Sequence, residues 1–127
     1  SFGMTDMAWH TLTEPFEGDV EQFEAVSMAP TQVLPVVSGT AMAPAFGHIF
    51  SGGYAAGYYG YKWAEVLEAD AFSLFKEKGI FNREVSGSFR ENILSKGGTE
   101  HPMELYVRFR GHKPETRALI EKMGLGK

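Results

Sequence analysis

The sequence feature that most limits the fold is a long amphipathic run between Lys62 and Lys78. Its large apolar side chains recur with the 3.6-residue period of an α-helix. Gly79 follows directly and is a typical residue to end such a helix. Immediately before the run comes the segment HIFSGGYAAGYYGY, which is rich in glycine and tyrosine. The pattern predicts a glycine loop that leads into one long helix.

Capping and helix-breaking residues predict shorter helices on both sides of this one. They are expected at residues 2–10, at residues 20–28 behind the N-cap Asp19, at residues 83–95 behind the N-cap Asn82, between an N-cap at Thr99 and Gly111, and from Pro114 to Gly124. Three prolines among small residues predict a packed but irregular segment over residues 30–47. Because no alternating run of apolar and polar residues is longer than four positions, the expected fold class is mainly α.

The composition is that of a soluble, folded protein and excludes several kinds of partner. A chain of 127 residues suits one domain with one core. The net charge of -4 provides no basic field, so neither nucleic acid nor a membrane is expected as a partner. There is no cysteine, and no apolar stretch approaches the length of a membrane span. These features predict a cytoplasmic location.

The histidines do not form the zinc-binding pattern of a helical metallohydrolase. Such an enzyme carries two histidines four residues apart on a helix, with a glutamate between them. His10, His48, His101 and His112 are far apart in the sequence, so no metal site is expected within this chain. The sequence also has no P-loop, nucleophile elbow or dinucleotide-binding motif. The residues by themselves therefore predict no complete active site.

Three tyrosines in the glycine-rich segment have the spacing of one helix face. Tyr54, Tyr58 and Tyr61 stand at i, i+4 and i+7, so in a helix their phenols would project from the same side. Such hydroxyls can hydrogen-bond a peptide or stabilise a developing oxyanion. The alternative is a helix whose small residues allow a neighbouring element to pack closely. For His48, the residues alone favour a buried core histidine.

Four segments of the chain follow one another in a distinctive order. They read FGHIFSGGYAAGYYGYKWAEVLEADAFSLF, GIFNRE, ILSKGGTEHPMELYVRFRG and ALIEKMGL. Their order and spacing resemble the C-terminal end of the thimet oligopeptidase family of zinc metallopeptidases, most densely over residues 46–124. The resemblance implies the helical C-terminal portion of a zincin-like catalytic domain. Its glycine loop and tyrosine helix would occupy residues 46–79, and its C-terminal helices residues 82–124.

The resemblance also implies a reaction and roles for individual residues. The reaction is the hydrolysis of short peptides by a zinc enzyme whose metal is bound outside this chain, by an upstream HExxH helix and a further glutamate. The residues assigned by resemblance are Tyr54 and Tyr61 as catalytic oxyanion donors, and His48, Gly52, Gly53 and Tyr58 as substrate-binding residues. No metal ligand is assigned to this chain.

Two other functions stay open at this point. One is a peptidyl-dipeptidase of the same family, which releases C-terminal dipeptides. The other is a helical domain that binds peptides without catalysis. The expected partners are short peptide substrates and the rest of the catalytic domain. By itself the chain is expected to be inactive, to bind no zinc and to self-associate through apolar surface that the parent enzyme would cover.

Overall fold

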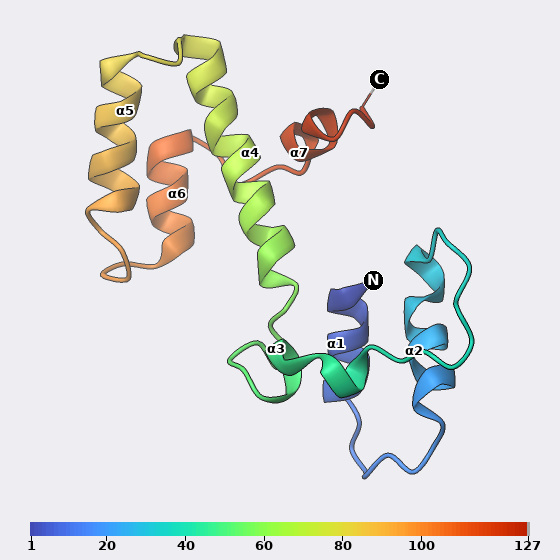
Figure 1. The fold of residues 1–127 in the computed structure, drawn as a ribbon. Helices are drawn as coiled ribbons and strands as arrows, with labels where there is room; N and C mark the ends of the chain where they lie inside the picture. The colour runs from blue at the N-terminus through green and yellow to red at the C-terminus, as the bar shows by residue number, and fades with distance from the viewer. Residues whose placement is uncertain (127) are drawn as a thin grey trace. The chain divides into compact units, whose positions relative to one another are not determined.

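The computed structural model describes residues 1–126, and every regular element among them is helical (Figure 1). This confirms the mainly α fold class. None of the helices in the described range is both long and apolar enough to cross a membrane. The chain divides into two compact units, unit 1 (Ser1–Tyr61) and unit 2, which starts at Lys62. Each unit is described by itself.

Unit 1 begins with two helices that lie side by side (Figure 1). Its helical elements are α1 (Phe2–His10), α2 (Val20–Met28), the 3-10 turns η1 (Ala29–Thr31) and η2 (Ala43–Ala45), and α3 (Gly47–Phe50). The bounds of α1 and α2 agree with the sequence prediction. Asp19 caps α2 as expected, because its carboxylate accepts a hydrogen bond of 2.9 Å from the backbone N–H of Gln22.

The proline-rich segment after α2 is irregular, as predicted, but it is packed only at its far end. The Val33 side chain is 93% exposed, and Leu34, Val36 and Val37 are exposed as well, whereas Ala43 and Phe46 are buried. The far end of the segment is held by Glu24 of α2, which is buried. Its carboxylate accepts hydrogen bonds from the backbone N–H groups of Met42 and Ala43. A buried carboxylate therefore fixes this part of the chain together with the buried side chains of Ala43 and Phe46.

Helix α1 buries polar side chains, which its sequence pattern does not predict. Thr5 and Asp6 are fully buried, whereas most large apolar side chains of the helix lie at the surface of the unit. Trp9 is a large apolar residue of α1 that packs against other rings of the unit. Its ring lies 5.0 Å from that of Phe16 and 4.2 Å from that of Phe23.

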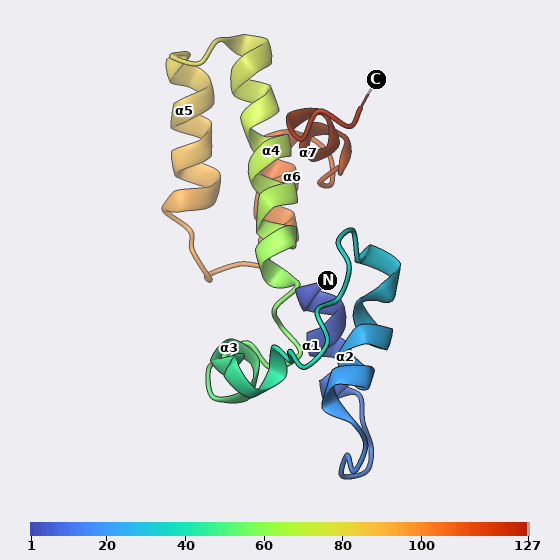
Figure 2. The ribbon, with the colours of Figure 1, turned by 45° about the vertical axis from the view of Figure 1, so that its right-hand side comes forward.

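Unit 2 consists of packed helices (Figure 2), and the core between them is rich in aromatic side chains. The elements that form it are α4 (Gly60–Lys78), which starts at the end of unit 1, α5 (Arg83–Phe89), the π-helical turn η3 (Arg90–Leu94), α6 (Pro102–Arg110) and α7 (Arg117–Lys122). The core residues come from α4, α5, η3 and α6. They are Ala71, Val85, Tyr106 and Phe109, surrounded by Leu67, Leu74, Phe75, Phe89 and Ile93.

Several helix ends of unit 2 lie where the sequence predicts them. Asn82 caps α5 by accepting hydrogen bonds from the N–H groups of Glu84 and Val85. Gly111 ends α6 in the left-handed region, at φ 88°, which glycine adopts without strain. The helix predicted over residues 83–95 changes its winding partway, because the N–H of Ser95 bonds to the carbonyl of Arg90 in an i to i+5 pattern.

Two predicted helix starts in unit 2 are wrong. The N-cap of α6 is His101 and not Thr99, whose hydroxyl instead donates to the carbonyl of Lys96. The imidazole of His101 takes the capping role because its Nδ1 accepts the N–H of Met103 at 3.2 Å. The last helix begins at residue 117, three residues after the predicted start at Pro114. A proline suits the first turn of a helix but does not require a helix to begin there.

One buried polar network crosses the unit 2 core. The Tyr106 hydroxyl donates to Asp70 of α4 at 2.6 Å, and the Arg110 guanidinium donates to the Asp70 carbonyl and to Ser73. Asp70 is only 3% exposed, although the sequence places it on the apolar face of the helix. Burial, followed by the hydrogen bond to Asp70, raises the pKa of Tyr106 above its ordinary value. This phenol therefore stays protonated and serves as a structural donor.

Candidate functional site

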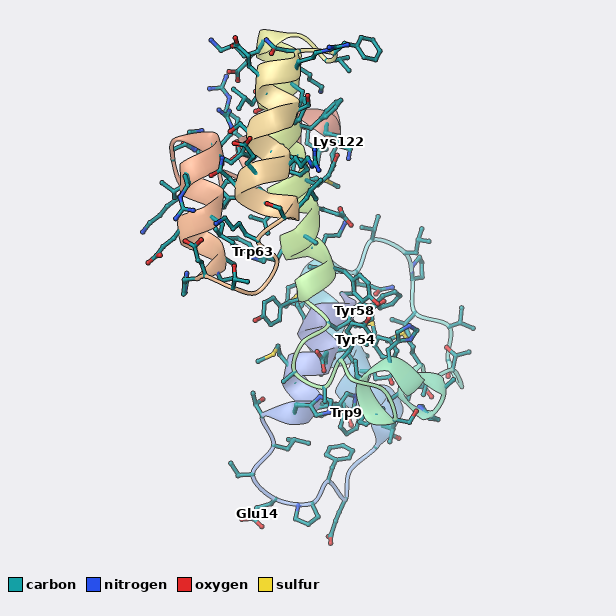
Figure 3. All side chains as sticks on the ribbon, turned by 90° about the vertical axis from the view of Figure 1, so that its left-hand side faces the viewer. Trp9, Glu14, Tyr54, Tyr58, Trp63 and Lys122 are labelled. Atoms are coloured by element: carbon teal, nitrogen blue, oxygen red, sulfur yellow. The ribbon has the colours of Figure 1, made fainter. Side chains whose placement is uncertain are left out.

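Three tyrosines and a histidine gather in unit 1 on the segment that leads into α4. We call residues 51–61 the tyrosine loop. The Tyr54 and Tyr61 rings stack with their centroids 5.1 Å apart, and the Tyr58 ring lies 5.1 Å from that of Tyr61. The imidazole of His48 lies 5.8 Å from the Tyr54 ring and 6.0 Å from the Tyr58 ring. Figure 3 shows Tyr54 and Tyr58 next to one another on this segment. The structure thus brings together the four aromatic residues that the sequence singled out.

The tyrosines converge through successive turns and not through a helix. The N–H of Gly57 bonds to the carbonyl of Tyr54, that of Gly60 to Gly57, and that of Tyr61 to Tyr58. Only at Gly60 does the regular helix α4 begin. The predicted grouping of the tyrosines is therefore correct, but the helix assumed for it is not present before Gly60. Turns with i to i+3 hydrogen bonds also return the chain to the same side every few residues.

The two loop glycines meet different surroundings. The N–H of Gly52 bonds to the carbonyl of Gly47 at 2.7 Å, and a Cβ on Gly52 would lie 2.9 Å from the carbonyl oxygen of His48. A side chain there would force the backbone to move. At Gly53 a Cβ would meet nothing within 4 Å. Gly52 is therefore required by the turn itself, whereas Gly53 leaves open backbone beside the tyrosines.

The phenols of the site are accessible within unit 1. Tyr54 is 41% exposed and Tyr61 is 44% exposed, while Tyr58 is half-buried. The pKa of Tyr61 is raised from 10.0, first because the side chain of Tyr54 hydrogen-bonds to it, and then by partial desolvation and by the neighbouring phenols. The Tyr61 hydroxyl consequently keeps its proton at neutral pH and is available as a hydrogen-bond donor.

His48 is not the buried core histidine that its sequence position favoured. It lies on the short helix α3, and its side chain is exposed. Its ring neighbours are aromatic, since the Phe46 ring lies 6.1 Å away and the rings of Tyr54 and Tyr58 lie 5.8 Å and 6.0 Å away. An exposed imidazole beside two phenols can donate or accept a hydrogen bond from a bound molecule.

Asp6 of α1 holds the tyrosine loop, and the sequence interpretation did not identify it. Its carboxylate is fully buried and accepts hydrogen bonds from the backbone N–H groups of Ala56, at 2.9 Å, and Tyr58, at 2.8 Å. His10, one turn further along α1, approaches the same carboxylate at 2.8 Å. The spacing of Asp6 and His10 on a helix is a visible signal, but nothing in it points to a loop about fifty residues away.

The other histidines have local structural partners. His101 caps α6, and Nδ1 of His112 bonds to the carbonyl of Lys113. Within residues 1–126 no three histidine, aspartate or glutamate side chains lie close enough together to hold a metal ion. The candidate site is thus a set of phenols, an imidazole and open backbone, all of which can form hydrogen bonds with a bound molecule.

Comparison with known proteins relates the whole of this architecture to one family. The sequence model of Peptidase family M3 matches residues 1–125. Oligopeptidase A of Escherichia coli (strain K12) is 49% identical over 125 residues, which cover 98% of this chain and 18% of that protein. Probable cytosolic oligopeptidase A of Arabidopsis thaliana is 42% identical, and covers 98% of this chain and 18% of its own length. Dipeptidyl carboxypeptidase of E. coli is 39% identical over 98% of this chain and 19% of its own length.

The chain therefore spans 18–19% of the length of these relatives, while almost all of it is matched. The match is not confined to the tyrosine loop, since it extends from residue 1 to residue 125 and includes the irregular segment before α3. It confirms the resemblance inferred from the glycine loop, the tyrosines and the segments that follow them. On this evidence the chain belongs to peptidase family M3.

Proposed function

We propose that this chain is the C-terminal part of a zinc-dependent oligopeptidase and that it binds short peptides at the tyrosine loop. Tyr54 and Tyr61 are the proposed donors to the oxyanion that forms at the scissile carbonyl. The proposed substrate-binding residues are His48, Gly52, Gly53 and Tyr58. Oligopeptidase A of E. coli, at 49% identity, supports this class of activity.

The observation that carries the proposal is the pairing of two accessible phenols, Tyr54 and Tyr61. Their ring centroids lie 5.1 Å apart in a stacked arrangement, and both side chains are exposed. Two phenols that stack in this way can both reach one common acceptor. An oxyanion placed between their hydroxyls would accept a hydrogen bond from each.

The raised pKa of Tyr61 supports its role as a donor. A phenol can stabilise an oxyanion only while it holds its proton, and the interaction with Tyr54 favours the protonated form. The donor should therefore remain active to a higher pH than a free tyrosine would. Because the pair is preorganised by the loop, little rearrangement is needed when charge develops on the substrate.

The glycines and His48 would bind the substrate backbone. Gly53 leaves open space beside the tyrosines, so an extended peptide could approach the main chain there and pair with its N–H and C=O groups. His48 is exposed next to Tyr54 and Tyr58, in reach of the same peptide. These residues would orient the peptide, and the phenols would act on its carbonyl.

The metal of the proposed enzyme must be held elsewhere. The side chains of residues 1–126 offer no group of three potential ligands, so they do not fit a zinc ion. We therefore assign the zinc, and the water that attacks the peptide, to a part of the parent protein outside this chain. It follows that this chain alone is expected to be inactive, although it would supply binding and oxyanion groups.

A peptidyl-dipeptidase is the second candidate function. Dipeptidyl carboxypeptidase of E. coli matches nearly the whole chain at 39% identity. The three oligopeptidase A relatives from bacteria match at 47–49%. The higher identity to oligopeptidase A favours cleavage within short peptides over release of C-terminal dipeptides.

Phenylalanine substitutions in the full-length enzyme test the proposed function, because they delete the hydroxyl and keep the ring. Tyr54→Phe or Tyr61→Phe should lower kcat on a quenched fluorescent peptide by about 100-fold with little change in KM. Tyr59→Phe is the matched control, since Tyr59 is 59% exposed and belongs to the same loop but does not join the stacked pair. Normal turnover in both single variants, or an equal loss in the control, would show that the tyrosines only pack.

A further inference from the structure

A buried carboxylate of α1 accepts two backbone hydrogen bonds from the tyrosine loop. Asp6 has no exposed surface, and its two oxygens are used separately. Oδ1 accepts the N–H of Ala56 at 2.9 Å, and Oδ2 accepts the N–H of Tyr58 at 2.8 Å. A carboxylate that receives one backbone N–H on each oxygen fixes both the position and the orientation of the peptide units that it binds.

The loop needs an external acceptor because its backbone is irregular at this point. Ala56 adopts φ 55°, in the left-handed region that a residue with a side chain rarely enters. The N–H groups of Ala56 and Tyr58 bond to Asp6 and not to a helical ladder. These two residues lie between Tyr54 and Tyr61, so whatever holds them also sets the separation of the two proposed oxyanion donors.

His10 orients the carboxylate from one turn further along α1. Its Nδ1 lies 2.8 Å from Oδ1 of Asp6 and 2.9 Å from the Asp6 carbonyl oxygen. Both of these partners are acceptors, so Nδ1 carries the hydrogen. The His10 ring also packs 5.6 Å from that of Phe50 on α3, which limits its rotation. A carboxylate held in this way has little freedom to follow a loop that moves.

We propose that Asp6, oriented by His10, is a positioning residue that holds Tyr54 and Tyr61 in register for oxyanion stabilisation. Asp6 is fully buried and does not touch the substrate, so it acts only through the loop. The inference rests on the proposed function, because that function is what makes the register of the two phenols matter. The hydrogen bonds between Asp6 and the tyrosine loop are observed whether or not the proposed function is correct.

Asp6→Asn in the full-length enzyme tests separately whether Asp6 fixes the tyrosine loop and whether the fixed loop matters for catalysis. An asparagine amide can accept one of the two N–H groups but must turn its own NH₂ towards the other, so one loop bond is lost. Hydrogen exchange of fragments covering the tyrosine loop should become at least about tenfold faster. On a quenched fluorescent peptide, kcat should fall roughly tenfold to 100-fold, with a smaller change in KM, as expected when reacting groups are displaced.

Glu24→Gln is the matched control. Glu24 is also a buried carboxylate in unit 1 and also accepts two backbone N–H groups, from Met42 and Ala43. Its partners lie in a different segment, so this variant should speed exchange there and leave both the tyrosine loop and kcat nearly unchanged. Equal effects of the two substitutions on kcat would mean that any buried carboxylate matters equally, and would overturn the proposal.

A double variant distinguishes positioning from general stability. If Asp6 acts through the oxyanion donors, Asp6→Asn should reduce kcat much less in a Tyr54→Phe background than in the native enzyme. Additive losses would count against the proposal. His10→Phe, which keeps a ring beside Phe50 but removes the hydrogen bond to Asp6, serves if Asp6→Asn does not fold. It should loosen the tyrosine loop and lower kcat by about threefold or more, and normal values of both would contradict the proposal.

The outcomes also separate this proposal from the proposed function. Unchanged exchange in the tyrosine loop of Asp6→Asn overturns the inference whatever the kinetics show. If the tyrosine loop of Asp6→Asn exchanges faster but kcat stays normal, the inference is also overturned. The kinetics of Tyr54→Phe then show whether the proposed oxyanion role fails as well. If Tyr54→Phe still loses turnover, the oxyanion role stands without Asp6, whereas normal turnover in both variants rejects the proposed function as well.

Discussion

Units 1 and 2 are stabilised in different ways. Unit 2 packs three helices and a π-helical turn around buried apolar side chains. The carboxylate of its buried residue Asp70 accepts a hydrogen bond from Tyr106 and forms an ion pair with Arg110. Unit 1 buries apolar side chains such as Phe46 and Ile49, but it also buries the carboxylates of Asp6 and Glu24, and both accept backbone N–H groups from segments outside their own helices.

The difference follows from where backbone hydrogen bonds can be made. A helix satisfies its own N–H groups, so packed helices need only an apolar surface to hold them together. A chain of turns leaves N–H groups without partners, and a buried carboxylate can accept several of them at a defined position. Unit 1 can therefore present open backbone and phenols at a loop, which is where binding residues tend to occur.

Phe109→Ala should have the largest effect on unit 2. Phe109 is 6% exposed, and its ring packs 5.1 Å from that of Phe89 and 6.2 Å from that of Phe75. Removing such a ring from a core costs about 4 kcal/mol, from lost transfer free energy and a cavity. Hydrogen exchange in the full-length enzyme should show α4 to α6 opening more easily while the tyrosine loop is unaffected. Equal loosening of the tyrosine loop would mean that the units do not have separate cores.

Asp70→Asn should have the second-largest effect on unit 2. It tests whether the buried polar network contributes to the stability of this unit. The substitution removes the buried ion pair in which Nε of Arg110 lies 3.6 Å from Oδ1 of Asp70, and it is expected to cost about 3 kcal/mol of opening free energy in α4 and α6. Glu77→Gln is the control, because Glu77 contacts the same guanidinium from an exposed position and should cost less than about 1 kcal/mol. A small loss of opening free energy in Asp70→Asn would show that the aromatic core is enough to stabilise unit 2.

The hydrogen bond from Tyr106 to Asp70 also predicts a pH dependence. Burial raises the pKa of Tyr106 above 10.0 in the folded protein, so its contribution to stability is fully present below the pKa of the unfolded state. It is lost only as the pH rises through the raised value. The difference in opening free energy between Tyr106→Phe and the native enzyme should consequently stay constant between about pH 7 and pH 9. A difference that shrinks within this range would contradict the assignment.

A comparison of Gly52→Ala with Gly53→Ala tests which glycine the tyrosine loop of unit 1 requires for its stability. An added methyl group at Gly52 would meet the His48 carbonyl at 2.9 Å, so we expect a loss of about 2 kcal/mol in local stability and faster exchange of the tyrosine loop. At Gly53 there is space, and stability should be unchanged. If Gly53→Ala nevertheless raises KM for the peptide, the open backbone contacts substrate. If it changes neither property, Gly53 is not a binding residue.

Asn82→Ala should have the smallest effect. Its side chain accepts hydrogen bonds from Glu84 and Val85 at the exposed start of α5, and removing an N-cap costs about 1 kcal/mol. Exchange should quicken only in the first turn of α5. Asn82→Asp, which retains an accepting oxygen, should restore the native rate. A loss that spreads across unit 2 would mean that this cap does more than begin a helix.

Features that depend on a few neighbouring residues were predictable from the sequence. The caps at Asp19 and Asn82 were correct because a cap bonds an N–H only two or three residues away. The long helix up to Lys78 followed from its period. Thr99 failed as a cap because the imidazole of His101, a residue type outside the usual N-cap set, accepts the N–H of Met103 instead, and local propensity does not predict this.

Features that depend on distant residues were not predictable from pattern alone. The grouping of Tyr54, Tyr58 and Tyr61 was anticipated, but the turns that produce it depend on Asp6, which bonds to the loop across 50 and 52 residues. A buried aspartate inside α1 contradicts the usual apolar pattern, so hydrophobic periodicity could not reveal it. The residue roles came from family resemblance, and they stay predictions until they are tested.

The most direct test of the oxyanion role compares ligands that mimic two states of the reaction. In the full-length enzyme, Tyr54→Phe and Tyr61→Phe should each weaken inhibition by a peptide with a tetrahedral phosphinate at the cleavage position by about 100-fold. Binding of a planar, uncleaved peptide of the same sequence should change less than about threefold. A parallel loss for both ligands, or no loss for either, would contradict the claim that these phenols recognise the tetrahedral state.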